Sequence, residues 1–315
     1  MKTRRAFIKT SLAAGAALSF HGLERLFAEQ TRSETSATQP SGPSAAQTLL
    51  VAVRDGERAV MLNRALAELG GIQAFVKPGQ RVLIKPNIGW DVPPERGANT
   101  HPELVARLVE LCFEAGAKSV SVFDNTVDEW RRAYESSGIE AAAKQRGATM
   151  VNGKDESLYR NVTVPGGVTL KETQVHRLYL DSDVVINVPV LKTHGGTRIT
   201  ACLKNLMGVV WDRRFFHRTD LHQCIADFLT VRKPDLNILD AYHPMVRNGP
   251  RGRSPEDCVQ MRTLLVSTDP VAVDAAGAKL LNFEPDQVAH IPAAAKLGVG
   301  IADLDQLDVR RIRMS

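Results

Sequence analysis

Short apolar runs alternate with amphipathic segments along the chain from residue 49 onward. The apolar runs predict strands at 49–53, 82–85, 119–124, 184–188, 236–239 and 263–266. Apolar residues at helical spacing predict helices at 58–69, 100–115, 200–210, 221–231 and 270–281, with further helical segments up to residue 146. Strands that alternate with helices are typical of a mostly parallel, doubly wound α/β sheet, and we expect the last three strands to run parallel.

Turn and cap residues mark the ends of several predicted elements. Gly70-Gly71 ends the first helix. Thr100 and Glu103 have the spacing of a capping box, and Asp269-Pro270 places an N-cap before a proline at the first helical position. Residues 158–180 differ, because alternating polar and apolar residues flank a Pro-Gly-Gly turn and predict a small antiparallel β insertion.

The first 48 residues have neither pattern. Residues 3–9 read Thr-Arg-Arg-Ala-Phe-Ile-Lys and precede a short Ala- and Gly-rich apolar stretch, which matches a twin-arginine export signal. We therefore predict a signal peptide at 1–28, a flexible linker at 29–48 and a single α/β domain at 49–315. A plain amphipathic N-terminal helix is the alternative. The signal predicts the twin-arginine translocation machinery as a partner and a periplasmic or extracytoplasmic location, with retention at the membrane if the signal stays uncleaved.

Composition and charge narrow the class of protein. The chain is 43% hydrophobic and 24% charged, as in soluble globular proteins, and after the N-terminus no apolar run is long enough to cross a bilayer. Its 40 Lys and Arg against 35 Asp and Glu give a net charge of +5. Residues 1–48 hold six of those basic residues and three of the acidic ones, so the predicted domain keeps only 34 against 32. With 5% aromatic residues and no basic stripe, nucleic acid is excluded as a partner.

Polar and ionisable residues follow five of the predicted strands. These residues are Lys85-Pro86-Asn87, Asp124, Lys192-Thr193-His194, Asp240 and Asp269. Ligands of open α/β sheets bind outside the carboxyl ends of the strands, so we expect these side chains at one edge. Asp269 is better explained as a helix cap. A lysine directly after a buried strand, such as Lys85 or Lys192, needs a nearby anion or carboxylate to balance its charge.

The densest polar segment runs from Lys192 to Gly208. Gly195-Gly196 precedes a predicted helix, where free backbone N–H groups and the helix dipole favour an anion. Within that helix, Thr200, Lys204 and Asn205 lie opposite an apolar stripe. The leading hypothesis is an exported enzyme or cofactor-dependent protein that binds an anionic small molecule. In it, Lys85, Lys192 and Lys204 neutralise charge, His194 serves as acid or base, and Asn87 and Asn205 orient the ligand. A solvated helix face after a flexible glycine turn is the alternative.

A metal or redox cofactor is the second hypothesis. Its candidate ligands are His194, His217, Asp240 and Asp274, although no H-x-x-x-H or H-E-x-x-H spacing is present. The four cysteines lie far apart and form no C-x-x-C, so the chain carries no internal ferredoxin-type cluster motif. The third hypothesis is a non-catalytic assembly or binding subunit whose partner is an exported redox protein.

Several of these motifs together resemble the domain of unknown function 362 family. They are Lys85-Pro86-Asn87, Pro189-Val190-Leu191-Lys192-Thr193-His194, Leu203-Lys204-Asn205-Leu206-Met207-Gly208, Leu239-Asp240-Ala241, Gly249-Pro250-Arg251-Gly252 and Thr268-Asp269-Pro270-Val271-Ala272-Val273-Asp274. The resemblance covers roughly residues 50–300 in the expected order. It implies an α/β fold but no reaction, since the family's activity is not established. Many members resemble iron–sulfur proteins through an added cluster domain, which this sequence lacks.

Overall fold

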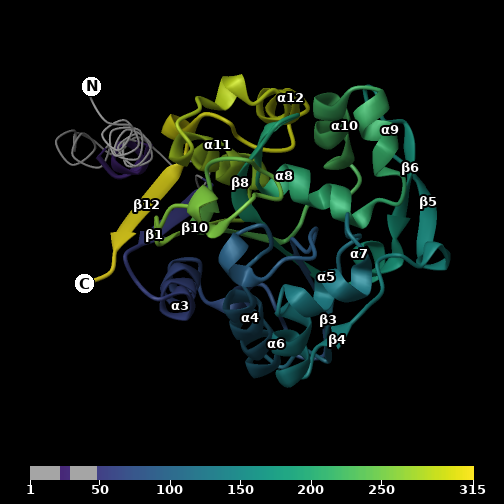
Figure 1. Ribbon diagram of the computed structural model, residues 1–315, viewed down its shortest axis with the longest axis horizontal. Coiled ribbons are helices and arrows are strands. Elements are labelled where there is room, and N and C mark those ends of the chain that lie inside the picture. The colour runs from purple at the N-terminus through teal and green to yellow at the C-terminus, as the bar shows by residue number, and fades with distance from the viewer. Residues whose placement is uncertain (1–21, 29–47) are drawn as a thin grey trace, which may run out of the picture.

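A mostly parallel, twisted sheet forms the centre of this computed structural model, which describes residues 22–28 and 48–315 (Figure 1). Within those residues the sheet has ten strands, of which eight follow the order β12-β1-β11-β10-β7-β2-β3-β4, while β8 pairs with β10 and β9. The strands are β1 (Leu49–Arg54), β2 (Arg81–Pro86), β3 (Ser119–Val122), β4 (Thr149–Met150), β7 (Val184–Val188), β8 (Val190–His194), β9 (Arg198–Thr200), β10 (Leu236–Met245), β11 (Thr263–Ser267) and β12 (Asp308–Arg313).

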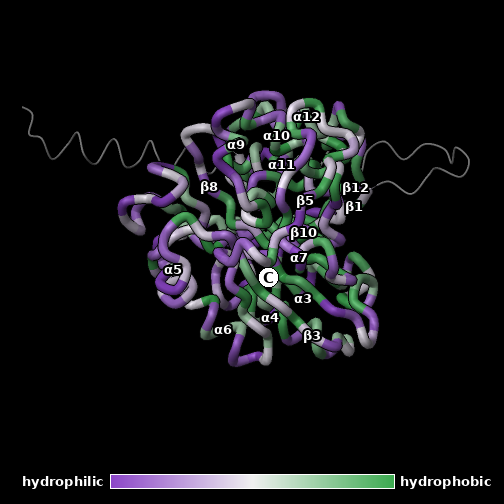
Figure 2. The backbone as a smooth tube through the Cα atoms, turned by 90° about the vertical axis from the view of Figure 1, so that its right-hand side faces the viewer, coloured by the Kyte–Doolittle hydropathy of each residue, from purple (hydrophilic) through white to green (hydrophobic). Residues whose placement is uncertain are grey.

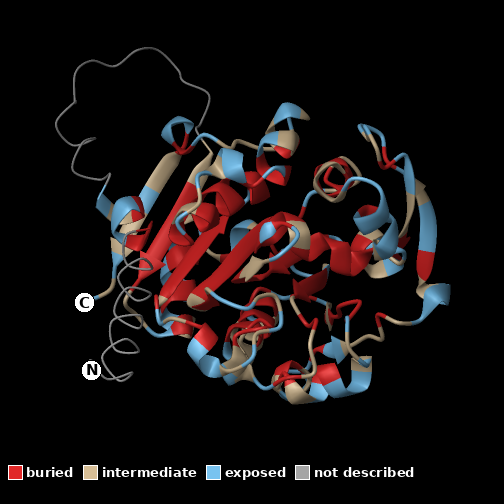
Figure 3. Ribbon diagram, turned by 45° about the horizontal axis from the view of Figure 1, so that its top comes forward, coloured by how far each residue is buried: buried red, intermediate tan, exposed pale blue. Residues whose placement is uncertain are grey.

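Helices cover both faces of the sheet, as expected for a doubly wound fold. One face carries α3 (Arg58–Glu68), α4 (Pro102–Glu114), α5 (Trp130–Ser136) and α6 (Ile139–Gln145). The other carries α8 (Cys202–Asn205), α9 (Arg213–Arg218), α10 (Leu221–Phe228), α11 (Pro270–Leu280) and α12 (His290–Lys296). Alternate strand residues serve alternate faces, since Leu50 and Ala52 join one core and Val51 and Val53 the other. Burial on both faces explains why the strands are continuous apolar runs (Figure 3).

One strand runs against the predicted direction. β11 pairs antiparallel with both β10 and β1, so the expectation that 263–266 would be parallel is wrong. Its carboxyl end therefore lies at the opposite edge from the ends of β2, β3 and β7, which are mutually parallel. Asp269 after β11 accepts hydrogen bonds from Val271 N and Ala272 N, which confirms its role as an N-cap.

The predicted antiparallel insertion is present as β5 (Tyr159–Thr163) paired with β6 (Glu172–His176). This hairpin projects at the edge of the molecule; β5 is largely exposed, whereas β6 ends in the buried Val175 and His176 (Figure 3). The outer loops and α5 are hydrophilic (Figure 2). The second strand of the hairpin ends earlier than predicted, because the chain turns at His176 into the short helix α7 (Arg177–Asp181).

The segment 200–210 is the largest error of the sequence analysis. Gly195-Gly196 does not precede a helix but forms the turn of the β8–β9 hairpin. The single turn α8 and the 3-10 helix η4 (Leu206–Val209) follow. Thr100 is not a capping residue either, because its hydroxyl donates to Val188 O and accepts from Asn87 N.

Part of the predicted leader packs on the domain. Residues 22–28 form a helix whose Leu23 and Leu26 are buried in the core, near the end of α11 and beside β12. Glu24 pairs with Arg54 at 3.4 Å, and the Arg54 guanidinium stacks over Phe27. The twin-arginine motif and most of the linker fall outside the described residues, so the export signal stays a prediction. No helix in the described part of the chain is long and apolar enough to cross a membrane.

Candidate functional site

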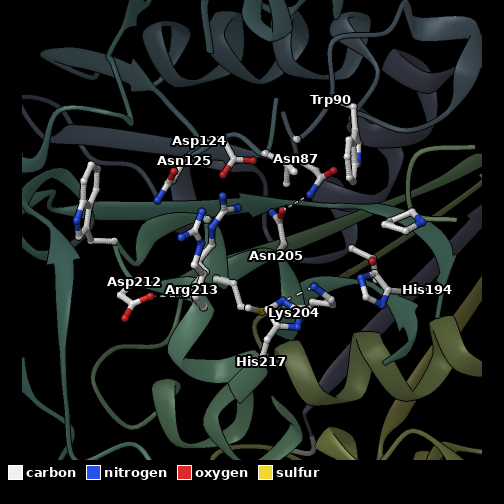
Figure 4. A pocket seen from close by; sticks show the side chains of 18 of the residues that line it. Asn87, Trp90, Asp124, Asn125, His194, Lys204, Asn205, Asp212, Arg213 and His217 are labelled. Carbon is white, nitrogen blue, oxygen red and sulfur yellow. Dashed lines mark hydrogen bonds between the residues drawn. The ribbon is translucent and has the colours of Figure 1, made fainter. Parts of the chain in front are cut away.

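A pocket of about 880 Å³ opens beyond the carboxyl ends of β2, β3 and β8 (Figure 4). The loops after β2 and β3, the β8–β9 hairpin and the segment from α8 to α9 form its walls. Of the predicted residues, the pocket wall contains Asn87, Lys192, His194, Thr200, Lys204, Asn205 and His217. The pocket therefore lies where the sequence predicted it, at the edge where the parallel strands end.

Lys85 lies beneath the pocket and does not line it. Its side chain is 0% exposed, and its Nζ lies 3.1 Å from Asp124 Oδ1. The same Nζ donates to Pro86 O at 2.7 Å and to Asn205 Oδ1 at 3.2 Å. Burial lowers the pKa of Lys85 and raises the pKa of Asp124, and in both cases the partner's charge opposes the shift. Lys85 therefore supports the site, and the expectation that it contacts a ligand is wrong.

Gly208 is required by this buried pair. A Cβ at Gly208 would overlap Asp124 Oδ1 and lie 2.7 Å from Lys85 Nζ. The Gly208 carbonyl also accepts a 2.9 Å hydrogen bond from Asn125 N. The glycine thus lets the η4 turn lie directly on the Lys85–Asp124 pair, which joins α8 to the ends of β2 and β3.

A row of asparagines connects the pocket wall to the sheet. Asn87 Nδ2 donates to Asn205 Oδ1 at 2.9 Å, and Asn205 Nδ2 donates to Asn187 Oδ1 at 2.9 Å (Figure 4). Asn187 Nδ2 in turn donates to Asn237 Oδ1 at 3.0 Å. The sequence analysis missed Asn187 and Asn237, although each interrupts an apolar strand run. Asn87 and Asn205 therefore both line the pocket and both connect it to the sheet.

Lys192 is buried in the pocket wall without an acidic partner. Its side chain donates to Asn87 Oδ1 at 2.8 Å and to Ala98 O. Burial, reinforced by the positive charge of Lys204, lowers the pKa of Lys192 to about 7. Within the described chain its amine makes no ion pair.

Three further cations with lowered pKa values line the pocket, and the exposed Arg214 lines it as well. Burial lowers the pKa of Lys204 to about 8 and that of Lys154 to about 8, and Arg213 adds to both shifts. The Arg213 guanidinium donates to Thr126 O at 2.8 Å, and burial lowers its pKa as well. Lys154, which follows β4, and Arg213, which lies on α9, were not predicted from the sequence.

The acidic residues in the wall already have partners. Asp124 pairs with Lys85, and Asp212 caps α9 by accepting from Arg214 N at 3.0 Å and Phe215 N at 3.2 Å. The other oxygen of Asp212 pairs with Arg218. Among the described residues, Lys154, Lys192, Lys204 and Arg213 therefore face the pocket with no carboxylate of their own.

His194 has a defined tautomer. Its Nδ1 accepts hydrogen bonds from Gly196 N at 3.0 Å and Thr197 N at 3.2 Å, so the proton of the neutral ring lies on Nε2. Burial and the charge of Lys204 lower the pKa of His194 to about 3. The ring is a neutral hydrogen-bond donor at physiological pH, which does not fit the expected acid or base role. The Gly196 N–H is occupied by the same contact, so the glycine turn does not cradle an anion there.

The candidate metal ligands do not come together. His194 and His217 line the pocket, but Asp240 pairs with Arg58 at 3.6 Å, and Asp274 accepts from Cys202 N at 2.6 Å. Across residues 22–28 and 48–315, no three His, Cys, Asp or Glu side chains are grouped to hold a metal ion. Asp274 instead caps α8, so that helix end is not available to a ligand.

Comparison with known proteins gives a family and a relative in sequence. The family described as "Domain of unknown function (DUF362)" matches residues 82–279. The thylakoid-associated protein sll1697 of Synechocystis is 28% identical over 252 residues, covering 78% of this chain and 76% of that protein.

Two solved structures match part of the chain. The lactate racemase apoprotein from Thermoanaerobacterium thermosaccharolyticum has a TM-score of 0.48 at 10% identity, covering 73% of this chain and 56% of that one. A Thermotoga maritima protein has a TM-score of 0.47 at 11% identity, covering 71% of this chain and 58% of that one. The present chain thus spans little more than half the length of either. The family match covers residues 82–279, well over half of the 315 residues, and the protein therefore belongs to the DUF362 family.

Proposed function

We propose that the pocket binds a small organic anion. The observation that carries this proposal is the set of four cations, Lys154, Lys192, Lys204 and Arg213, that line one cavity without a carboxylate partner among the described residues. Burying a charge without a partner costs free energy, and burial lowers the pKa of each of these groups. A bound anion supplies the missing negative charge.

The remaining wall residues narrow the ligand class. Trp90 and Trp211 lie on the wall, and a cavity of about 880 Å³ holds far more than an inorganic ion. Asn125 Oδ1 is buried and accepts no hydrogen bond within the described chain, although Asn125 Nδ2 is bonded to Val210 O. An unmatched acceptor of this kind favours a ligand with a hydroxyl or amine group. A carboxylate or phosphate that also carries a hydrogen-bond donor and an apolar part fits these features best.

The test is a binding screen of organic carboxylates and phosphates by thermal shift, followed by calorimetry of the best ligand. Lys204→Met and Arg213→Met should each weaken binding about tenfold or more, because each removes a charge-assisted hydrogen bond. Lys118→Met is the matched control, since Lys118 is exposed and far from the pocket. Equal affinity in all four proteins would exclude the pocket as the binding site.

A further inference from the structure

We propose that Lys192 is a nucleophile that forms an imine with a carbonyl-bearing carboxylate in the pocket, a 2-oxo or 3-oxo acid. This inference rests on the proposed function, because the carboxylate is the anion that the neighbouring cations bind. It goes further in assigning a covalent step and a reacting atom, the Nζ of Lys192.

The hydrogen-bond partners of the two buried lysines differ in a way that bears on reactivity. Lys85 Nζ has three oxygen partners: it donates hydrogen bonds to Pro86 O and Asn205 Oδ1 and forms an ion pair with the carboxylate oxygen Asp124 Oδ1, which favours the charged ammonium ion. Lys192 Nζ has two, Asn87 Oδ1 and Ala98 O, and neither is charged. A neutral amine has two N–H groups and one lone pair. The contacts of Lys192 use both N–H groups and leave the lone pair without a partner in the described chain.

The surroundings of Lys192 also favour the neutral amine. Its pKa of about 7 results from burial first and then from Lys204, with a smaller contribution from Lys85 in the same direction. Asp124 and Cys258 oppose the shift. A far larger fraction of the Lys192 amine is therefore neutral at pH 7 than of an exposed lysine. Burial and a neighbouring cation together are a known means of activating a lysine nucleophile.

The step balances without an oxidant or reductant. The Lys192 lone pair attacks the carbonyl carbon, a C–N bond forms, and the carbonyl oxygen takes up a proton. The nitrogen then loses a proton and the hydroxyl group leaves as water, which gives the imine. Lys204 is the candidate proton donor to the leaving hydroxyl because its pKa of about 8 keeps it charged at pH 7, and the Nε2–H of His194 donates a hydrogen bond to the ligand.

The experiment uses the wild-type chain, glyoxylate as the probe and cyanoborohydride to trap the imine as carboxymethyl-lysine. Peptide mapping by mass spectrometry measures the modified fraction of each lysine. At pH 7 we expect Lys192 to be modified at least about tenfold faster than the exposed Lys118, from its larger neutral fraction. The rate at Lys192 should level off above pH 7, whereas the rate at Lys118 should keep rising. Acetaldehyde, which has no negative charge, should show a smaller preference for Lys192.

Oxalate, which forms no imine, separates this proposal from the proposed function. One outcome supports the anion site and overturns the imine. In it, oxalate raises the melting temperature of the wild type but not of Lys204→Met, and glyoxylate does not modify Lys192. If neither probe interacts with the pocket, the imine is overturned, and the screen of organic carboxylates and phosphates alone decides the proposed function. Lys192→Met with unchanged circular dichroism should lose the adduct, and a pocket adduct that persists in this variant would also overturn the assignment.

Discussion

Replacing Lys204 with methionine should stabilise the protein near neutral pH. Methionine keeps the length and apolar stem of lysine but removes the ammonium group, whose only hydrogen-bond contact within the described chain is Met207 Sδ at 3.7 Å. Lys204 thus lowers the stability of the folded protein, as expected of a residue whose role is to bind a ligand.

The pKa of Lys204 sets the size of the gain. Burial lowers it from 10.5 to about 8, a difference equivalent to at most about 3 kcal/mol of unfolding free energy. Because the side chain borders a pocket that admits water, we expect about 1–2 kcal/mol. Between pH 8 and 10.5 the unfolded chain holds more protons at Lys204 than the folded chain does, so the wild type gains stability as pH rises through that range. The advantage of the variant should therefore shrink as pH rises above 8.

Urea unfolding of the wild type, Lys204→Met and the control Lys118→Met at about pH 7 and about pH 9.5 measures this effect. Lys118 is exposed, and its replacement should change stability at neither pH. A variant that is less stable than the wild type at pH 7 would refute the reasoning, as would a stability difference that is the same at both pH values. An organic anion that binds the pocket should stabilise the wild type more than the variant.

Two further substitutions test the supporting structure. Gly208→Ala should lower the unfolding free energy by about 2–3 kcal/mol, because its Cβ would overlap Asp124 Oδ1, whereas Gly195→Ala should be tolerated since nothing lies within 4 Å of a Cβ there. Similar unfolding midpoints in urea for the two variants would contradict the packing of η4 on the buried pair. Leu26→Ala should cost about 2 kcal/mol because Leu26 is fully buried, while Arg25→Ala, at an exposed position, should cost nothing measurable. Thermal unfolding of the full chain checks this, and an unchanged midpoint for Leu26→Ala would mean that residues 22–28 do not pack on the domain.

The place of the pocket could be predicted from the sequence, because apolar runs locate strands and parallel strands end at one edge. Strand direction could not, since the run at β11 has the same composition as the parallel strands and only its pairing partners set its direction. The helix predicted at 200–210 failed for a similar reason. Its apolar residues are buried as expected, but a glycine pair ends a strand in a hairpin turn as readily as it precedes a helix.

The chemistry of the site was harder to predict than its place. Lys85 and Lys192 both appear in the sequence as lysines at strand ends, yet one is held by a carboxylate and the other is not. That difference arises from Asp124 and Ala98, which belong to other segments. Lys154 and Arg213 likewise reach the pocket from parts of the chain that no local pattern connects.

The row of asparagines has a polarity. Every hydrogen bond in it is donated away from the pocket, in the order Lys192, Asn87, Asn205, Asn187, Asn237 and Thr268 O. Because Lys192 donates to Asn87 Oδ1, it fixes the orientation of the first amide, and Asn87 Nδ2 then donates to Asn205 Oδ1. An imine at Lys192 keeps one N–H at most, so either Ala98 O or Asn87 Oδ1 must lose its donor. If Asn87 loses it, that amide is free to rotate, but Asn205 stays in place because Lys85 Nζ also donates to Asn205 Oδ1. A covalent change at Lys192 would therefore reorient the pocket wall at Asn87 while Lys85 shields the sheet from it.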